Sequence, residues 1–302
     1  TVRRFMNHPA TAGYFLRDEP SADDFAELGA WAARIRATDD AHYCYLNLFP
    51  NYAPCETLKT DSYREYVNRF DREVPLQLLS FDHYPVVGDT CRPEWYENLE
   101  IFSDEARKVG KPFWAFALAT AHEPYPIPDL AQLRLQVYSD LAYGAQGIQY
   151  FTYWTPEKNP TWDFHHAPVE RSSGRRTDVY DKIKQMNAEI RALSGVFLGC
   201  EVVSVRHTGE SIPRGTVRLT ELPDGVKKLE TTGAGAVVSE LRNGNNRFIV
   251  IVNRDFKNSM TLQIELDETA SRILKDGSVV PASIYHETMV VEPGDAMIYM
   301  FK

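Results

Sequence analysis

The sequence predicts an α/β protein in which part of a (β/α)8 barrel is followed by an antiparallel β-sandwich. Between residues 13 and 193, apolar strand-like segments alternate five times with amphipathic helix-like segments. Continuous apolar strands need cover on both faces, so this alternation indicates a parallel sheet with helices outside it. Polar or acidic residues directly follow each of these strands, as in barrels whose active site lies at the carboxyl ends of the strands. After residue 195, short segments of alternating hydrophobicity begin, which is typical of a β-sandwich.

The first strand–helix unit opens with the stretch 13–20, an apolar run that ends in two acids and a proline. Its aromatic and β-prone residues predict a short buried strand. Pro20 cannot continue a strand ladder, so we expect Asp18 and Glu19 where the strand opens into a loop. Ser21 is a good N-cap for the helix that follows. The macrodipole favours acids within a helix start for purely structural reasons, but Glu19 precedes the cap.

Four further units follow in the same pattern. The predicted strands are residues 42–48, 76–81, 112–118 and 147–154, and the predicted helices of all five units are residues 21–37, 61–70, 93–109, 129–143 and 178–193. Five units cannot close an eight-stranded barrel. We therefore expect the first three units in a part of the polypeptide that precedes residue 1, and the alternative is a smaller open sheet. The first interpretation is preferred because half a barrel leaves two long apolar strand edges unpaired.

The change in pattern at Gly195 divides the chain into residues 1–195, the barrel part, and residues 196–302, the β-sandwich. Turn signals such as Pro223-Asp224-Gly225 separate the alternating segments of the second part. The predicted strands there are residues 200–206, 216–219, 236–241, 247–253, 261–266 and 296–301. No acidic clusters follow them. We expect the sandwich to cover a flank of the barrel, with carbohydrate binding as the lesser alternative.

Composition excludes several classes of partner. The chain has 302 residues and a net charge of -9 without a basic run, which argues against nucleic acid and anionic membrane surfaces. No apolar stretch approaches the roughly 20 residues of a membrane span. The four cysteines are scattered without metal-ligand spacing. Asp163, His165 and His166 alone suggest a metal, and no other residue at ligand spacing supports them. We expect no metal and no cofactor.

Acids at strand ends suit glycoside hydrolysis, which needs two carboxyl groups on opposite sides of the scissile bond. Glu19 is the best proton donor, because neighbouring aromatic residues and Pro20 can desolvate it and the charge of Asp18 favours its protonated form. Two residues are candidates for the second carboxyl group. Glu123 lies in the loop after the fourth strand, and Asp82 ends the third strand.

Other residues near the strand ends are candidates for substrate binding, together with Asp18 and Asp82. Tyr153 and Trp154 follow the last strand, where Trp154 suits a sugar-stacking platform or simply packs on the final helix. His83 and Tyr84 can orient the carboxylates or hold a sugar hydroxyl, although the same residues also suit an ordinary loop. Asn47 is expected to bond backbone groups or sugar hydroxyls.

Four segments carry a resemblance to a known family: residues 12–21 (AGYFLRDEPS), 80–85 (SFDHYP), 111–114 (KPFW) and 150–154 (YFTYW). Through them, residues 1–195 resemble the second half of a clan A glycoside hydrolase, and are most similar to family 42 β-galactosidases and their bacterial relatives. The resemblance implies a retaining (β/α)8 enzyme with its acid/base Glu after the fourth barrel strand and its nucleophile after the seventh. It places Glu19 in the acid/base position. It also implies an oligo- or polysaccharide substrate and a periplasmic or extracellular bacterial location.

The sequence departs from the family at two points. Asp18 stands where the clan usually has Asn before the acid/base Glu, and Phe116-Ala117-Leu118 stands where a family 42 enzyme has its nucleophile. Glu123 comes later and reaches the cleft only if the loop folds back. Our leading hypothesis is a retaining glycosidase with Glu19 as acid/base and Glu123 as nucleophile. The alternative is a catalytically silent carbohydrate-binding protein that uses the same cleft. A non-glycosidic α/β hydrolase is disfavoured because the Gly-x-Ser-x-Gly elbow is absent.

Overall fold

The computed structural model describes residues 2–282 and 287–302, and the N-terminal part of this described chain contains five parallel strands. They are β1 (Gly13–Asp18), β2 (Tyr43–Asn47), β3 (Leu79–Asp82), β6 (Phe113–Leu118) and β7 (Gly147–Phe151). β1 pairs with β2, and β6 pairs with β3 on one side and β7 on the other. A parallel bridge between Leu48 and Phe81 connects the two groups in chain order. The carboxyl ends of the strands therefore lie along one edge.

The longer helices connect these strands and cover one face of the sheet, whereas α1 (Val2–Phe5) precedes β1 and buries no side chain. The other helices are the 3₁₀ helix η1 (Ala22–Asp24), α2 (Phe25–Arg36), α3 (Cys55–Leu58), α4 (Tyr63–Glu73), α5 (Trp95–Lys108), α6 (Leu130–Ala142), α7 (Asp178–Ala192) and α8 (Ser194–Phe197), with a small hairpin of β4 (Val86–Val87) and β5 (Thr90–Cys91) before α5. The Asp129 carboxylate accepts a hydrogen bond from the backbone N of Gln132 at 2.7 Å. This cap satisfies one of the donors that the start of α6 leaves free. Every helix within residues 2–282 and 287–302 is too short or too polar to span a bilayer.

The two faces of the parallel strands differ in exposure. Cys44 and Leu46 of β2 are buried in the core, whereas Tyr43 on the opposite face is 48% exposed. Successive side chains of a strand point to opposite faces, so one face is covered and the other lies partly open. On this open face the ring of Tyr45 lies 6.1 Å from the ring of Trp114. The open face is therefore rich in aromatic side chains.

The C-terminal part is a two-sheet β-sandwich. Its strands are β8 (Glu201–His207), β9 (Val226–Thr231), β10 (Ala236–Asn243), β11 (Asn246–Asn253), β12 (Met260–Leu266), β13 (Ser271–Ile273), β14 (Val279–Pro281), β15 (Glu287–Val291) and β16 (Ala296–Phe301). In the described chain one sheet has the order β14-β13-β16-β11-β10-β8 and the other has the order β15-β12-β9, with antiparallel pairs throughout. Gly244 in the β10–β11 hairpin has φ 59°. A tight two-residue hairpin favours this left-handed conformation.

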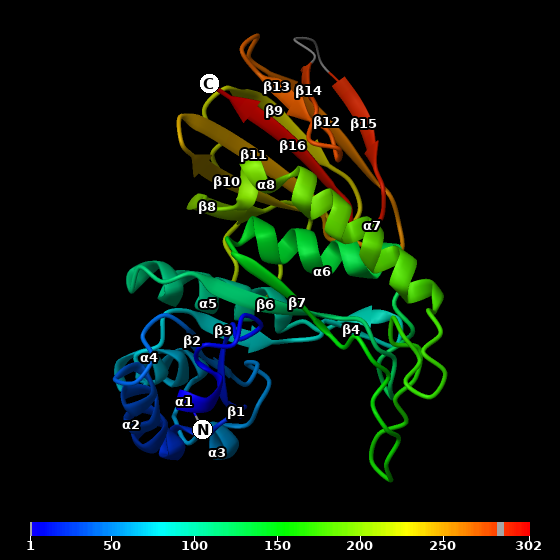
Figure 1. The fold of residues 1–302 in the computed structure, drawn as a ribbon. Helices are drawn as coiled ribbons and strands as arrows, with labels where there is room; N and C mark the ends of the chain where they lie inside the picture. The colour runs from blue at the N-terminus through cyan, green and yellow to red at the C-terminus, as the bar shows by residue number, and fades with distance from the viewer. Residues whose placement is uncertain (1, 283–286) are drawn as a thin grey trace.

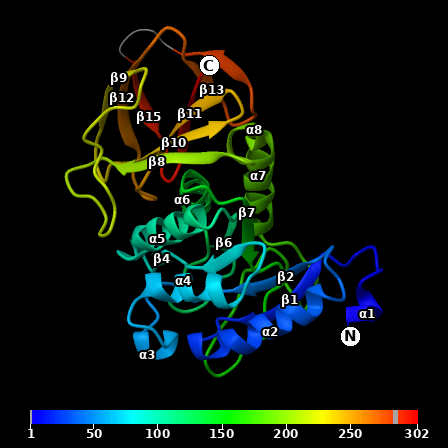
Figure 2. The same ribbon diagram turned by 90° about the vertical axis from the view of Figure 1, so that its left-hand side faces the viewer.

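One hydrophobic core extends from the helices into the sandwich. Leu135 of α6 is fully buried in the same cluster as Val250 of β11. At this junction the Ser239 hydroxyl of β10 donates a buried hydrogen bond to the carbonyl oxygen of Ala142 at 2.6 Å. Figures 1 and 2 show α6 and α7 between the sandwich and the N-terminal strands. The sandwich therefore packs on the helices that flank the parallel strands.

Some predicted elements differ in the structure. The strand predicted at residues 76–81 begins only at Leu79, because the apolar residues before it fill the core without joining a ladder. The strand predicted at residues 147–154 ends at Phe151, and Trp154 instead bridges Val169 in the following loop. The strand predicted at residues 216–219 is wrong: this segment makes one isolated bridge, from Arg218 to the end of β8.

Candidate active site

Three acidic side chains meet where β1 and β3 end. Asp18 is the last residue of β1, Glu19 follows it, and Asp82 is the last residue of β3. Asp18 lies opposite Asn47 in the β1–β2 ladder, and the backbone N of Glu19 donates to the carbonyl oxygen of Asn47 at 2.9 Å. Parallel pairing thus brings residues that are far apart in the sequence to one place, as the sequence predicts for this edge of the sheet.

The backbone of Glu19 is unusual. Its φ is 43°, in the left-handed region that residues other than glycine rarely adopt. This conformation costs on the order of 1–2 kcal/mol for a residue with a Cβ. The hydrogen bond to β2 and the buried Pro20 that follows hold the chain in this position. Local strain of this kind concentrates at functional sites.

Asn47 links the acids to the interior of the sheet. Its side chain is buried, and its Nδ2 donates to Asp82 Oδ1 at 2.6 Å and to Asp18 Oδ1 at 3.4 Å. Its Oδ1 accepts from the Ser80 hydroxyl at 3.1 Å. Since Ser80 donates to the amide oxygen, the amide NH₂ must face the carboxylates. The side-chain NH₂ of Asn47 therefore donates hydrogen bonds to the carboxylates of both Asp18 and Asp82.

A polar network of Ser80, Gln149 and Tyr45 lies beside Asn47 and was not predicted from the sequence. The Ser80 hydroxyl accepts a hydrogen bond from Gln149 Nε2 of β7 at 3.1 Å and lies 2.9 Å from the Tyr45 hydroxyl of β2. Tyr45 precedes Asn47 by two positions, as Ser80 precedes Asp82. Period two places each pair on the same face of its strand. That spacing is the only signal in the sequence that indicates this network.

Burial and like charge raise the proton affinity of the two central acids. The pKa of Glu19 is raised to about 8, mainly by burial and then by the negative charges of Asp82 and Asp18, with a hydrogen bond to Asp82. Burial also raises the pKa of Asp82 to about 6, although hydrogen bonds from Asn47 and Tyr84 oppose this. Glu19 and Asp82 therefore titrate as a pair that holds one proton near neutral pH.

Tyr84 and His83 have different surroundings, although they are adjacent. The Tyr84 hydroxyl hydrogen-bonds the Asp82 carboxylate, so Tyr84 lies at the acid pair. The buried His83 ring packs edge-on against Tyr52 at 5.0 Å. Burial, and then the charge of Arg92, lowers the pKa of His83 to about 3. His83 is therefore neutral at ordinary pH, and its ring contact is with Tyr52.

Glu123 lies in the loop after β6 and is exposed. Its backbone N donates to Asp163 Oδ1 at 2.8 Å, which connects this loop to the one after β7. The main influences on the pKa of Glu19 and Asp82 are instead burial and the neighbouring side chains of Asp18, Asn47 and Tyr84. The structure thus brings Asp82 to Glu19 and leaves Glu123 on a neighbouring loop.

The remaining candidates lie beyond β7. Tyr153 and Trp154 are 54% and 48% exposed, and their rings meet edge-on at 5.5 Å. His165 Nδ1 lies 2.8 Å from His166 Nδ1, and His165 Nε2 lies 3.8 Å from Asp163. Among residues 2–282 and 287–302, no three His, Cys, Asp or Glu side chains form a group that could hold a metal ion.

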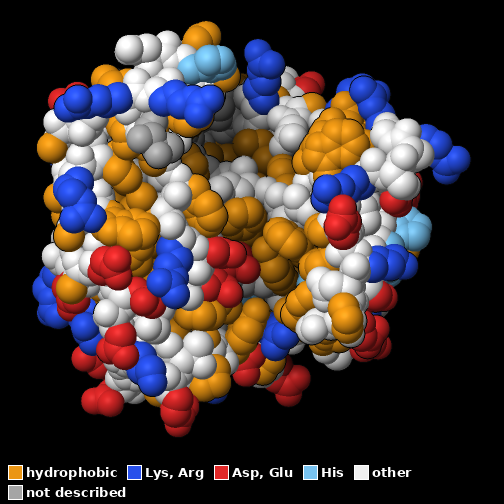
Figure 3. Space-filling model, turned by 60° about the horizontal axis from the view of Figure 1, so that its bottom comes forward, with side chains coloured by type: hydrophobic (Ala, Val, Ile, Leu, Met, Phe, Trp, Pro, Cys, Tyr) orange, Lys and Arg blue, Asp and Glu red, His pale blue; other side chains and the backbone are white. Residues whose placement is uncertain are grey.

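Figure 3 shows acidic side chains gathered beside a hollow that hydrophobic side chains border.

The acid pair predicts a pH dependence of stability. Both pKa values are raised above the unfolded-state values of roughly 4, so between about pH 4 and pH 8 the folded state holds protons that the unfolded chain has released. We expect the free energy of unfolding to fall across this window as pH rises. Urea unfolding at pH 5 and pH 8 should show a smaller fall for Glu19→Gln than for the wild type. Glu27→Gln, an exposed site on α2, is the control. Equal falls for wild type and Glu19→Gln would contradict the prediction.

Several solved structures resemble the chain. They include the β-galactosidase from the psychrophilic Marinomonas ef1 (13% identity, 57% of this chain and 27% of that chain, TM-score 0.43). The GH51 α-L-arabinofuranosidase from Thermotoga petrophila RKU-1 matches at 11% identity over 100% of this chain and 69% of that chain, with TM-score 0.48. The GH128 endo-β-1,3-glucanase from Sorangium cellulosum matches at 18% identity over 60% of this chain and 73% of that chain, with TM-score 0.39. All three TM-scores lie below 0.5. The chain spans about a quarter of the length of the Marinomonas enzyme.

A family match is more informative. Residues 42–193, half of the chain, match glycoside hydrolase family 42, whose description is β-galactosidase. The matched stretch contains Asn47, Asp82 and Glu123, and it begins after Asp18 and Glu19. No curated protein sequence matches the chain. On the strength of the family match, the chain belongs to glycoside hydrolase family 42.

Proposed function

We propose that the protein hydrolyses O-glycosidic bonds with retention of configuration, in the manner of a β-galactosidase, and that Glu19 is its acid/base. The observation that carries this proposal is the contact between Glu19 and Asp82 at the strand ends. It keeps a proton on the pair near neutral pH. A protonated carboxyl group can donate its proton to the departing glycosidic oxygen, and the resulting carboxylate can then activate water.

We further propose that the five parallel strands are strands four to eight of a (β/α)8 barrel. Their order along the sheet follows the chain, and helices cover one face only. The open face carries aromatic side chains such as Phe15, which is 62% exposed. In a closed barrel these side chains would face the interior. Residues 1–195 then form the catalytic part, and residues 196–302 support it through the shared core.

A retaining mechanism also needs a second carboxyl group as the nucleophile. Retaining glycosidases hold their two carboxyl groups about 5–5.5 Å apart, with the sugar between them. Asp82 is a direct neighbour of Glu19 whose charge raises the pKa of Glu19, so we assign it that role. We therefore keep Glu123 as the proposed nucleophile, and we propose that its loop moves inward when sugar binds. Asp18, Asn47 and Tyr84 would then hold sugar hydroxyls.

Two substitutions separate these roles. In the complete polypeptide assayed on aryl β-galactosides, Glu123→Gln should lower kcat by at least about 100-fold. Asp82→Asn should keep measurable activity but shift the basic limb of the pH–rate profile to lower pH, because a negative charge beside Glu19 is lost. Glu221→Gln, at an exposed position before β9, is the matched control. Full activity of Glu123→Gln, combined with complete loss in Asp82→Asn, would assign the nucleophile to Asp82 in place of Glu123.

The alternative function is carbohydrate binding without catalysis. It is favoured by the end of β6, where a family 42 enzyme would have its nucleophile and where Ala117 is fully buried. In that case the exposed rings of Tyr153 and Trp154 would stack on sugars, as aromatic side chains do in binding clefts. Retained sugar binding with no turnover of any aryl glycoside in a panel would favour this function over hydrolysis.

A further inference from the structure

A tight turn in the loop after β6 carries Glu123. The backbone N of His122 donates to the carbonyl oxygen of Tyr125 at 3.2 Å, and the backbone N of Tyr125 donates back to the carbonyl oxygen of His122 at 2.5 Å. Glu123 and Pro124 form the tip between them. Two hydrogen bonds thus close the turn, so its four residues move as one unit. A contact that holds Tyr125 therefore also sets the position of Glu123.

Arg92 makes such a contact. It follows β5 directly, and its backbone N donates to the carbonyl oxygen of Pro85 at 2.7 Å, which closes the base of the β4–β5 hairpin. Its Nη2 donates to the Tyr125 hydroxyl at 3.1 Å. Its guanidinium carbon lies 4.4 Å from the ring centre of Tyr52 and 5.8 Å from that of Tyr125, within the range of a cation–π attraction. Arg92 thus joins the loops after β2, β3 and β6.

The same hairpin contacts the turn at a second point. In the bend between β4 and β5, the backbone N of Gly88 donates to the carbonyl oxygen of Pro124 at 3.0 Å. The ring of Tyr125 also packs edge-on against Tyr84, with ring centres 5.8 Å apart. The Tyr84 hydroxyl hydrogen-bonds Asp82 of the acid pair. Contacts of the turn therefore lead directly to the acid pair.

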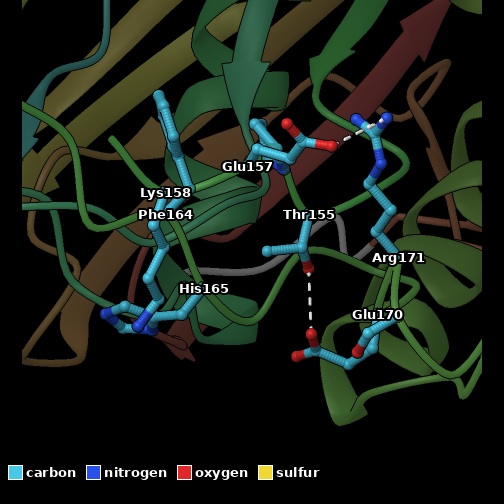
Figure 4. A pocket seen from close by; sticks show the side chains of 9 residues that line it. Thr155, Glu157, Lys158, Phe164, His165, Glu170 and Arg171 are labelled. Atoms are coloured by element: carbon cyan, nitrogen blue, oxygen red, sulfur yellow. Dashed lines mark hydrogen bonds and ion pairs between the residues drawn. The ribbon is translucent and has the colours of Figure 1, made fainter. Parts of the chain in front are cut away.

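On its other side the turn contacts the loop after β7. The backbone N of Glu123 donates to Asp163 Oδ1 at 2.8 Å, in an exposed position. Figure 4 shows part of this loop, where the Thr155 hydroxyl donates to Glu170 Oε2 at 3.3 Å. Hydrogen bonds are stronger where water is excluded, and the bond from Arg92 is partly buried. Arg92 therefore provides the firmer of the two side-chain attachments.

The contacts of Arg92 depend on the flat shape of its guanidinium group. This group can lie against the Tyr52 ring while one of its N–H groups bonds the Tyr125 hydroxyl. The Nε atom is buried and has no hydrogen-bond partner among residues 2–282 and 287–302. An unpaired buried donor costs free energy, so stability alone does not explain an arginine here. Its placement instead suits a role in the site.

We infer that Arg92 is a positioning residue for the hydrolysis of glycosides, and that it acts through Tyr125 on Glu123. The inference rests on the proposed function, in which the turn brings Glu123 towards the acid pair as nucleophile. Because Arg92 holds the tip of the Tyr125 side chain, the turn can swing about that point without drifting along the sheet edge. Glu123 therefore reaches the same place in each reaction cycle.

Steady-state kinetics on substituted phenyl β-galactosides tests this inference. Arg92→Ala should lower kcat/KM by about 10- to 100-fold, since a misplacement of about 1 Å costs up to about 100-fold. Tyr125→Phe, which removes only the hydroxyl that Arg92 bonds, should lower it about tenfold. Arg92→Lys keeps the charge and should lie between Arg92→Ala and the wild type. For a glycoside with a poor leaving group, KM should change less than about twofold, because the contacts to the sugar remain.

The dependence on the leaving group separates Glu123 from the acid pair as the target of Arg92. Attack by the nucleophile is needed for every glycoside, so the loss should be equal for phenols of low and high pKa. A residue that acts through Glu19 would cost more with poor leaving groups. A loss in Arg92→Ala that grows with the pKa of the phenol would therefore overturn the inference. Full activity of Tyr125→Phe would overturn it too, even if Arg92→Ala does not fold.

Arg247→Ala is the matched control. Arg247 is also half-buried, and its guanidinium carbon lies 4.5 Å from the ring centre of Phe301, but it belongs to β11 of the sandwich. This variant should keep the kcat/KM of the wild type, and an equal loss would attribute the effect of Arg92 to stability. Full activity of Arg92→Ala beside an inactive Glu123→Gln would overturn the inference alone. Full activity of Glu123→Gln would remove the proposed nucleophile as well. If the wild type cleaves none of the glycosides, the proposed function itself fails.

Discussion

Glu19→Gln should lower kcat on aryl glycosides by about 100- to 10,000-fold, the range that a positioned general acid contributes. Glutamine has nearly the same shape, so it can replace Glu19 at the end of β1, but it cannot donate a proton to the departing oxygen. The loss should depend on the leaving group. Phenols of low pKa leave without protonation, so their glycosides should lose far less than substrates with poor leaving groups. Steady-state kinetics across a series of substituted phenyl glycosides measures this dependence.

The kinetic test needs a variant that changes a nearby charge without removing the proposed acid. Asp18→Asn suits this purpose, because Asn47 Nδ2 lies 3.4 Å from Asp18 and mainly bonds Asp82. It should shift the pH profile and leave the dependence on the leaving group intact. Unchanged turnover in Glu19→Gln for all substrates would remove Glu19 from the reaction.

Leu135→Ala should lower the free energy of unfolding by about 2–5 kcal/mol, the usual cost of a cavity left by a buried leucine. Leu135 is fully buried in α6, and the backbone beside it approaches Gly294 of the sandwich. Its side chain belongs to the core that α6 shares with β10 and β11, so helix and sheet surround it and cannot easily collapse into the space. Urea or thermal unfolding of the protein measures the effect.

Leu198→Ala is the matched control for this cavity. Leu198 is 66% exposed, so the same deletion should change stability by less than about 0.5 kcal/mol. A similarly small effect for Leu135→Ala would mean that the core is not continuous across α6.

The sequence was sufficient to predict that Asp18, Glu19, Asn47 and Asp82 lie at one edge of the sheet, although it did not predict the position of Glu123. Parallel strands place their carboxyl ends on one edge, so the acids after β1 and β3 and Asn47 at the end of β2 had to come together. Ordinary strand and helix patterns were enough for this. Local turn residues were also enough to predict the β10–β11 hairpin. Gly244 adopts the left-handed conformation that a tight turn needs, and this depends only on neighbouring residues.

Features that depend on register and loop path were not predictable. The contact of Ser80 with Gln149 requires β3, β6 and β7 to align in one particular register, which no local pattern fixes. The exposure of Glu123 depends on how two loops meet through Asp163. The segment at residues 216–219 alternates like a strand, yet it lies beside the end of β8 without a full ladder. In each case tertiary contacts decide the outcome.

A chain of hydrogen bonds runs from Gln149 through Ser80 to Asn47, and evolution can alter it. These hydrogen bonds end on the carboxylate of Asp82, but Gln149 and Ser80 belong to the interior of the sheet. Natural variation at Gln149 or Ser80 can therefore change the pKa of Asp82 while every residue proposed to contact the sugar stays the same.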